Sequence, residues 1–179
     1  MSQLNQAHEL TLPTNYLEPH WYAARTRSRH EKSIADQLLR KNVEFFLPLY
    51  ESERRWTDRK VRIDLPLFPG YIFVQVPLRE RLRVLEVPGV VGFVSFGNEP
   101  AAMDGSEIEI LRQGLSSKMK AEPHPYLKVG QRVFVKHGPL SGLEGILLRK
   151  KDSFRVVISI DLIMRSVAVE IPASDLQTL

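Results

Sequence analysis

The chain has 179 residues and a net charge of +4, with 43% hydrophobic and 26% charged residues, a composition typical of a soluble protein with one or two cores. It contains no cysteine, which excludes disulfides, thiol catalysis and cysteine-ligated zinc. No apolar run approaches the roughly 20 residues that span a bilayer, and residues 1–20 lack the basic start and apolar core of a signal peptide. We expect a cytoplasmic monomer without membrane contact or cofactor, beginning with a disordered tail over residues 1–20.

Lysine and arginine are distributed unevenly. Residues 21–83 carry fourteen Lys/Arg against eight Asp/Glu, residues 84–126 three against six, and residues 127–179 eight against five. Basic blocks separated by an acidic one favour a polyanion-facing surface on part of the molecule. Ordinary solvated charge explains the counts equally well.

The first ordered part of the chain predicts a strand and then a helix. Residues 21–27 begin with two aromatics and end basic, a pattern typical of a strand. Ser28 and Glu31 stand three residues apart, as in a capping box, and Asn42 suits a helix end. The residues between them that share an apolar face at helical spacing are Ile34, Ala35, Leu38 and Leu39.

A second strand over residues 43–49 precedes a charged stretch, 51–60, that we expect to form a hairpin arm. Four basic residues surround Trp56 there. A tryptophan among arginines can stack on a base or lie beneath a guanidinium of its own surface. We favour the structural role for Trp56 and nucleic-acid contact for the arginines.

The chain is organised around residues 65–74, where three aromatics and four aliphatics are punctuated by two prolines and a glycine. Pro66 and Pro69 suit a sheet edge or a strand start, and Gly70 permits a conformation or a close approach that a side chain would block. Residues 71–76 read as a strand too apolar for one exposed face. An ordinary buried strand is one interpretation. The rest of the chain favours the other, a surface that stays partly open for a partner.

The following segment predicts a short helix, a strand over residues 90–96, and a further helix opened by Asp104 and Glu107. The apolar residues of the helices recur at helical spacing, with Leu78, Leu82 and Leu85 in the first and Ile108, Leu111 and Leu115 in the second. Helices that return onto one antiparallel sheet describe an α+β sandwich, which we assign to residues 21–115.

Residues 116–126 are polar, carry two prolines and show no apolar period, so we expect a flexible interdomain linker. Residues 127–179 show short strands separated by glycine turns, which predicts a small all-β barrel.

An enzyme is an alternative from a different class. The five histidines show no metal-ligand spacing, and no nucleophile motif or phosphate-binding glycine loop is present. The carboxylate pairs Asp58 with Asp64 and Glu51 with Glu53 flank a charged arm that looks solvated. We therefore expect no catalysis.

Two independent motif sets resemble the NusG family over roughly residues 21–179, in the expected order. The segments similar to its N-terminal domain are Trp21-Tyr22, Arg29-His30-Glu31-Lys32, Phe68-Pro69-Gly70-Tyr71 and Pro88-Gly89-Val90. The segments similar to its KOW domain are 129–133 and 138–145. The arm and the start of the first helix are more similar to specialised UpxY-like and RfaH-like antiterminators than to housekeeping NusG.

The resemblance implies a transcription elongation and antitermination factor that binds RNA polymerase and suppresses pausing or termination. An apolar pocket of its N-terminal domain would take the coiled coil of the polymerase clamp. The implied pocket residues are Tyr22, Phe68, Pro69, Gly70, Tyr71 and Phe73. Basic groups would contact non-template DNA or nascent RNA. The candidates are Arg27, His30, Arg40, Arg54, Arg55, Arg59, Arg79 and Arg83, although His30 fits an ordinary surface position equally well.

The KOW domain would recruit a further partner, a small-subunit ribosomal protein or the termination factor Rho. The candidate residues, which could instead simply cover the barrel end, are Ile160, Leu162, Ile163 and Met164. Recurring β-branched residues predict a barrel rather than the helical hairpin that this domain forms in one relative. The alternative function is a KOW-containing RNA-binding or ribosome-associated protein that does not act on polymerase.

Overall fold

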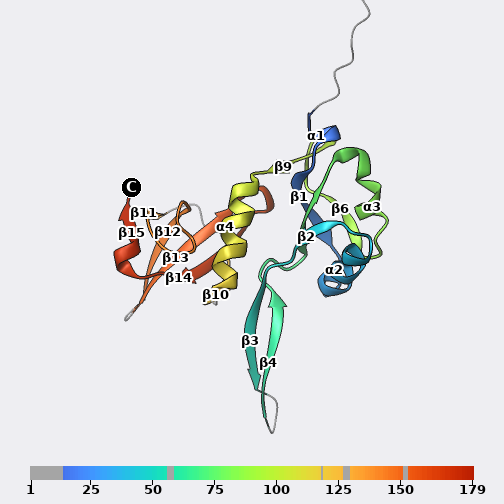
Figure 1. Cartoon of the computed structure of the whole chain (residues 1–179). Helices are drawn as coiled ribbons and strands as arrows, with labels where there is room; N and C mark the ends of the chain where they lie inside the picture. Colours follow the sequence, from blue (N-terminus) through green and yellow to red (C-terminus); the bar gives the residue numbers. More distant parts are fainter. Residues whose placement is uncertain (1–13, 56–58, 118, 127–129, 151–152) are drawn as a thin grey trace, which may run out of the picture.

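The structure is a computed structural model that describes residues 14–55, 59–117, 119–126, 130–150 and 153–179. Figure 1 shows an N-terminal domain, which holds elements α1 to α4, beside a C-terminal all-β part built from β10 to β15, here called the β domain. The β3–β4 hairpin projects away from both (Figure 1). This is the predicted α+β arrangement.

The N-terminal sheet has five antiparallel strands, in which β1 is central. They are β1 (His20–Thr26), β2 (Glu44–Phe46), β5 (Tyr71–Val76), β6 (Val90–Phe93) and β9 (Ala102–Met103). Because side chains alternate between the faces of a strand, Trp21 and Ala23 join one core while Tyr22 and Ala24 join another. Both faces are therefore covered, which explains why β1 and β5 lack a polar side.

Different helices cover the two faces. The face that carries Tyr22 packs on α2 (Glu31–Arg40), η1 (Leu78–Glu80) and α3 (Leu82–Leu85), whereas α4 (Gly105–Ser116) packs on the other. The predicted start of α4 is confirmed, since the Asp104 carboxylate accepts a hydrogen bond from the Ser106 amide at 2.8 Å. The predicted capping box of α2 is wrong, because the N-cap is His30 and makes no side-chain capping bond.

Two predicted elements are interrupted. The strand expected over residues 43–49 stops at Phe46, and β3 begins only at Leu49, because Pro48 between them lacks an amide donor. The strand expected over residues 90–96 divides into β6 and a small hairpin of β7 (Ser95–Phe96) and β8 (Glu99–Pro100).

The predicted helix around Leu82 is also divided, into the 3-10 turn η1 and the short α3. The break shifts the helical phase. Leu82, expected on the apolar face, is therefore 58% exposed, and Val84 is buried in its place.

The predicted hairpin arm is confirmed in the strands β3 (Leu49–Arg55) and β4 (Lys60–Pro66), which pair antiparallel along their whole length. Arg62 lies 3.5 Å from the carboxylates of both Glu51 and Glu53 across the ladder. Trp56, at the expected tip, lies outside the described residues.

The β domain is a six-stranded antiparallel sheet in the order β10-β14-β13-β12-β11-β15. Its strands are β10 (Ala121–His124), β11 (Arg132–Val135), β12 (Glu144–Lys150), β13 (Ser153–Ile160), β14 (Arg165–Glu170) and β15 (Leu176–Thr178). The expected strand conformation is confirmed, although β15 has no counterpart in the sequence prediction.

Two segments expected to lack regular structure contain some. Within the expected linker 116–126, β10 pairs with β14, because extended backbone at a sheet edge can satisfy its hydrogen bonds without an apolar side-chain pattern. The expected tail 1–20 contains a short helix, α1 (Thr14–Leu17), and its last residue, His20, is the first residue of β1. Residues 1–13 lie outside the described part of the chain.

Candidate functional site

Residues Phe68 to Tyr71 form a tight turn that leads into β5, here called the Phe68–Tyr71 turn. The Tyr71 amide donates to the Phe68 carbonyl at 3.1 Å, and Gly70 has a φ of 85°. Proline at the second position and glycine with positive φ at the third are the marks of a type II turn. No described atom lies within 4 Å of the Cβ that a side chain at Gly70 would add. Backbone conformation, rather than space, therefore requires this glycine.

Two neighbouring elements hold the peptide groups of Gly70. Its amide donates to the Glu31 carboxylate at 2.9 Å, and its carbonyl accepts from the Thr26 amide at 2.8 Å. Glu31 is only 3% exposed. The carboxylate expected to cap α2 therefore binds the Phe68–Tyr71 turn instead.

The rings of this region gather on one face of the sheet. Phe73 packs edge to face on Phe68, with 5.7 Å between ring centroids, and stacks on Phe46 at 6.2 Å. Phe68 is 1% exposed and Phe73 is fully buried, so the expectation that these rings stay partly open is wrong. The side chains that remain accessible are Pro69, which is exposed, and Tyr71, which is half-buried.

Tyr22 does not join this group. It lies on the opposite face, where its ring packs edge to face on Phe93 with 5.7 Å between centroids. Burial raises the pKa of the Tyr22 hydroxyl, and the nearby Asn15 side chain partly offsets this rise. The hydroxyl oxygen makes no hydrogen bond of standard geometry within the described part of the chain. The sheet register pairs Ala23 with Phe73, which puts Trp21, two residues away, on the face of the turn.

Trp21 is therefore a residue that the sequence reasoning missed. The Arg112 guanidinium of α4 lies 5.3 Å from the centroid of the Trp21 ring and 5.4 Å from that of Phe46. Arg112 also pairs with Glu44 at 3.2 Å. The period-two alternation along β1 shows that Trp21 and Ala23 share one face of the strand. Only the pairing of β1 with β5 shows that this is the face of Phe73.

The β domain completes the cover over this face. One continuous apolar cluster contains Phe68 and Leu111 from the N-terminal domain and Leu140, Val167 and Val169 from the β domain. A Cβ at Gly114 of α4 would lie 2.4 Å from Leu140 Cδ2, so the absence of a side chain lets the two parts approach. The Arg165 guanidinium lies 5.9 Å from the centroid of the Tyr71 ring.

The predicted partner site of the β domain contributes to the same apolar cluster. Ile160 and Ile163 are 5% and 4% exposed and belong to the shared cluster, and Leu162 packs against it. Met164 is 62% exposed, in a left-handed conformation with a φ of 48°. Most of the predicted patch is therefore covered in this arrangement.

Three of the predicted nucleic-acid residues lie exposed on or beside α2. The Arg27 amide donates to the Gly89 carbonyl at 2.8 Å, and a Cβ at Gly89 would lie 3.2 Å from His30 Cβ. These contacts bring Arg27 and His30 together at the start of α2. Arg40, at the other end, stands about 15 Å away along the helix axis. We call Arg27, His30 and Arg40 the basic face.

Arg83 has a different position. Its half-buried guanidinium donates to the Glu80 carboxylate at 2.5 Å and to the Lys41 carbonyl, which ties α3 to the end of α2. Arg79 is exposed and lies 3.8 Å from the same glutamate. Arg83 is thus better described as a structural cross-link than as part of the basic face.

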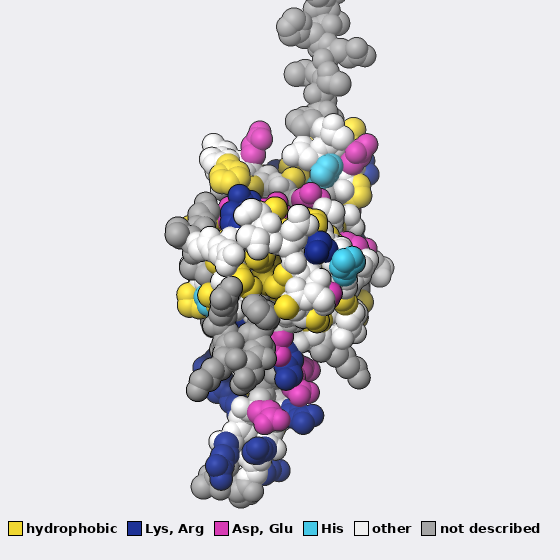
Figure 2. All heavy atoms as spheres, turned by 90° about the vertical axis from the view of Figure 1, so that its left-hand side faces the viewer, with side chains coloured by type: hydrophobic (Ala, Val, Ile, Leu, Met, Phe, Trp, Pro, Cys, Tyr) yellow, Lys and Arg dark blue, Asp and Glu magenta, His cyan; other side chains and the backbone are white. Residues whose placement is uncertain are grey.

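The arm carries the remaining candidates. Arg54 and Arg55 of β3 and Arg59 before β4 are exposed. Figure 2 shows Lys and Arg side chains gathered on this projecting hairpin, with Asp and Glu side chains nearer its base.

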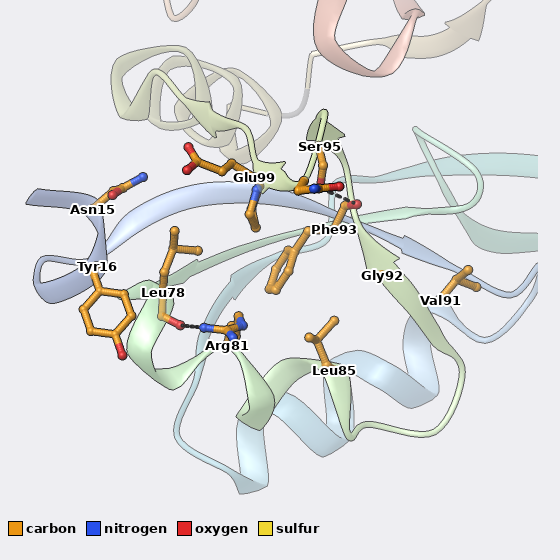
Figure 3. Close-up of a pocket in the computed structure, with 12 residues that line it drawn as sticks. Asn15, Tyr16, Leu78, Arg81, Leu85, Val91, Gly92, Phe93, Ser95 and Glu99 are labelled. Carbon is orange, nitrogen blue, oxygen red and sulfur yellow. Dashed lines mark hydrogen bonds between the residues drawn. The ribbon is translucent and has the colours of Figure 1, made fainter. Parts of the chain in front are cut away.

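A separate hollow of about 560 Å³ lies between α1, the η1–α3 segment, β6 and the β7–β8 hairpin. Leu78, Leu85 and Phe93 line it, together with Arg81, whose guanidinium donates to the Leu78 carbonyl at 3.3 Å (Figure 3). Glu99 also contributes to its lining. Nothing in the sequence predicted this hollow, which takes its walls from segments far apart in the chain.

The described residues contain no group of three or more His, Cys, Asp or Glu placed to hold a metal ion. Over the same described ranges, no helix is long and apolar enough to cross a membrane. The fold defines a class of two-part protein in which the apolar face of an α+β domain packs against a small β domain.

Comparison with known proteins identifies the family. The family model described as "Transcription termination factor nusG" matches residues 19–112, which is more than half of the chain. The transcription termination/antitermination protein NusG of Rickettsia felis is 28% identical over 155 residues, covering 78% of this chain and 81% of that protein. The NusG of Pseudomonas aeruginosa is 25% identical and covers 88% and 97%.

Among solved structures, "Domain interaction in Thermotoga maritima NusG" matches with a TM-score of 0.60 and 22% identity, covering 92% of this chain and 99% of that one. This likeness supports the fold. The chain belongs to the NusG family of transcription termination and antitermination factors.

Proposed function

We propose that this NusG-family factor binds the clamp coiled coil of RNA polymerase through the apolar face around the Phe68–Tyr71 turn, and that it thereby suppresses pausing or termination. One observation carries the proposal. The rings of this face are buried in a cluster that the N-terminal domain does not complete by itself, since Leu140, Val167 and Val169 come from the β domain. A partner helix with apolar side chains can cover the same face.

The proposal requires the two parts to separate, because the β domain occupies the face. We infer that the N-terminal domain and the β domain then behave as two domains, with the β domain including strand β10 from the C-terminal half of the expected linker 116–126. Ile160 and Ile163 belong to the same cluster, and separation would remove any cover that the N-terminal domain gives them. They could then bind a small-subunit ribosomal protein or Rho. The solved Thermotoga maritima protein is itself described by a domain interaction, which supports such a contact here.

The basic face and the arm would contact non-template DNA or nascent RNA while the factor is bound to polymerase. Arg27, His30 and Arg40 are exposed on one helix and its approach, adjacent to the turn through Gly70. Arginine serves both phosphate contact and stacking on exposed bases of a single strand. The finer assignment to a specialised antitermination paralog stays a prediction.

Two substitutions with opposite effects test polymerase binding by the full chain. Tyr71→Ala removes an accessible ring of the face, so its affinity for core RNA polymerase should fall about tenfold. Arg165→Ala removes the β-domain group over that ring, so affinity should rise. Phe96→Ala, which deletes a 76% exposed ring elsewhere in the N-terminal domain, is the matched control. Wild-type affinity in the Tyr71 and Arg165 variants alike would refute the proposed surface.

A salt titration tests the basic face. A variant that binds one phosphate fewer on a single strand should show a slope of log affinity against log salt that is shallower by about 0.7. Arg27→Ala and Arg40→Ala should each have this effect, whereas Arg132→Ala, an exposed β-domain arginine paired with Glu144, should not. A pull-down from cell lysate tests the alternative function. Recovery of ribosomal RNA without polymerase subunits would support an RNA-binding protein that does not act on polymerase.

A further inference from the structure

The proposed polymerase-binding turn and the proposed basic face meet at the peptide groups of one residue. Gly70 donates its amide to Glu31, the first residue of α2, at 2.9 Å. It accepts at its carbonyl from Thr26, the last residue of β1, at 2.8 Å. Arg27 follows Thr26 and His30 precedes Glu31 in the chain. Each of these two basic residues is therefore one position from a hydrogen bond to Gly70.

A proline–glycine turn can in general place its central peptide group in either of two orientations. Type I and type II turns differ by rotation of the peptide between the second and third residues, and glycine accepts φ of either sign at little cost. Gly70 has a φ of 85°, and its N–H points to the Glu31 carboxylate. An acceptor in that position stabilises the type II orientation and leaves the alternative without a partner for this N–H.

Glu31 is placed for this task rather than for helix capping. Among the described residues it is the one buried carboxylate, at 3% exposure. A buried carboxylate is costly unless hydrogen bonds satisfy it, and the donor that it binds belongs to the turn, 39 residues away in sequence. The side chain of His30, the N-cap residue of α2, makes no capping hydrogen bond. The carboxylate is therefore a tertiary contact between α2 and the Phe68–Tyr71 turn.

We propose that Glu31 is a positioning residue that couples nucleic-acid binding on the basic face to polymerase binding at the Phe68–Tyr71 turn. Nucleic acid held by Arg27 and His30 restrains the ends of β1 and α2, which carry both partners of Gly70. The turn is then fixed in one orientation before polymerase arrives, so binding costs less conformational freedom. Such coupling is reciprocal, so polymerase strengthens the hold on nucleic acid by the same factor. This inference rests on the proposed function.

The experiment measures the coupling as a ratio. The full chain is titrated with an isolated clamp coiled-coil fragment of RNA polymerase, with and without a saturating single-stranded DNA oligonucleotide. We expect the ratio of the two dissociation constants to be about ten in the wild type, within the usual range of coupling between sites. Glu31→Ala removes the acceptor and brings the ratio to about one. Glu31→Gln keeps a neutral, weaker acceptor and gives an intermediate ratio.

Asp36→Ala is the matched control, because it removes the same charge from an exposed position of the same helix and should leave the ratio unchanged. A purely structural Glu31 would weaken both ligands without changing the ratio, and a wild-type ratio in both Glu31 variants overturns the coupling. If the alanine variant does not fold, the lower ratio expected of the glutamine variant decides alone. If the wild-type chain binds the fragment equally tightly with and without the oligonucleotide, the coupling is refuted but the proposed function is not. Failure to bind the fragment at all refutes the proposed function and the coupling with it.

Discussion

Replacing Gly114 with alanine should separate the two parts of the protein while strengthening the helix that carries the change. The added Cβ would lie 2.4 Å from Leu140 Cδ2 and 3.1 Å from Leu140 Cγ. Neither distance is compatible with ordinary van der Waals contact, so the Leu140 side chain, now 3% exposed, has to move. The helix backbone of α4 itself needs no change.

The two effects have opposite signs, and the loss at the interface is the larger. Glycine inside a helix is about 1 kcal/mol less favourable than alanine, so α4 gains stability. Fully burying a leucine side chain is worth about 1.5–3 kcal/mol, and displacing Leu140 removes much of that from the interface between the parts. A loss of about 2 kcal/mol shifts the closed-to-open ratio about thirtyfold toward the open arrangement.

Energy transfer between two labels reports the separation. The chain has no cysteine, so Lys32→Cys in α2 and Gln131→Cys beside β11, both at exposed positions, can carry the dyes. Transfer should fall in Gly114→Ala, and the N-terminal domain should melt at the same or a higher temperature. Polymerase affinity should rise.

Gln113→Ala is the control, since it favours the helix at an exposed neighbouring position without entering the interface. Leu140→Ala removes the same β-domain side chain without a clash and should also open the protein. Wild-type transfer in Gly114→Ala, together with a higher melting temperature, would show that Leu140 repacks freely and would refute the reasoning.

Two further predictions concern charged groups. Arg83→Ala should lower the free energy of unfolding in urea by about 1–3 kcal/mol, because its hydrogen bonds cross-link two helices. It should leave the salt slope of DNA binding unchanged, and a shallower slope would return Arg83 to the basic face. Partial burial, followed by repulsion from Asp104 and Asp161, raises the pKa of Glu107 from 4.5. The folded protein thus binds this proton more tightly than the unfolded chain, and the associated stability is lost as pH rises through the raised pKa. Glu107→Gln should therefore melt above the wild type at pH 7.5, with the difference vanishing at pH 4, and equal melting temperatures at both values would contradict this cause.

Local chemistry was sufficient to predict most of the elements. Alternating residues gave β11, and the run of β-branched residues gave β13 and β14. Asp104 was correctly expected to begin α4, and Asn42 to follow the end of α2, where it adopts a φ of 52°. The charged arm was correctly expected to be a hairpin. Each signal depends on a few neighbouring residues, so no tertiary information is needed to read it.

Which residues make up the candidate site was harder to predict from the sequence. The resemblance singled out the Phe68–Tyr71 turn, but it placed Tyr22 beside Phe73, where the pairing register puts Trp21. It also counted Arg83 among the nucleic-acid residues, although the guanidinium cross-links α3 to α2. A residue type can be read from the chain, but its face and its partner depend on which strands and helices pack together.

The sequence by itself determined where most strands and helices form, because backbone preferences and apolar periodicity act over a few residues. Only the tertiary structure decided that Glu31 binds Gly70 instead of capping its own helix, and that Phe68 and Phe73 are buried beneath α4 and the β domain. Burial and hydrogen bonding between such distant residues depend on the packing of the whole chain, which no short window of sequence contains.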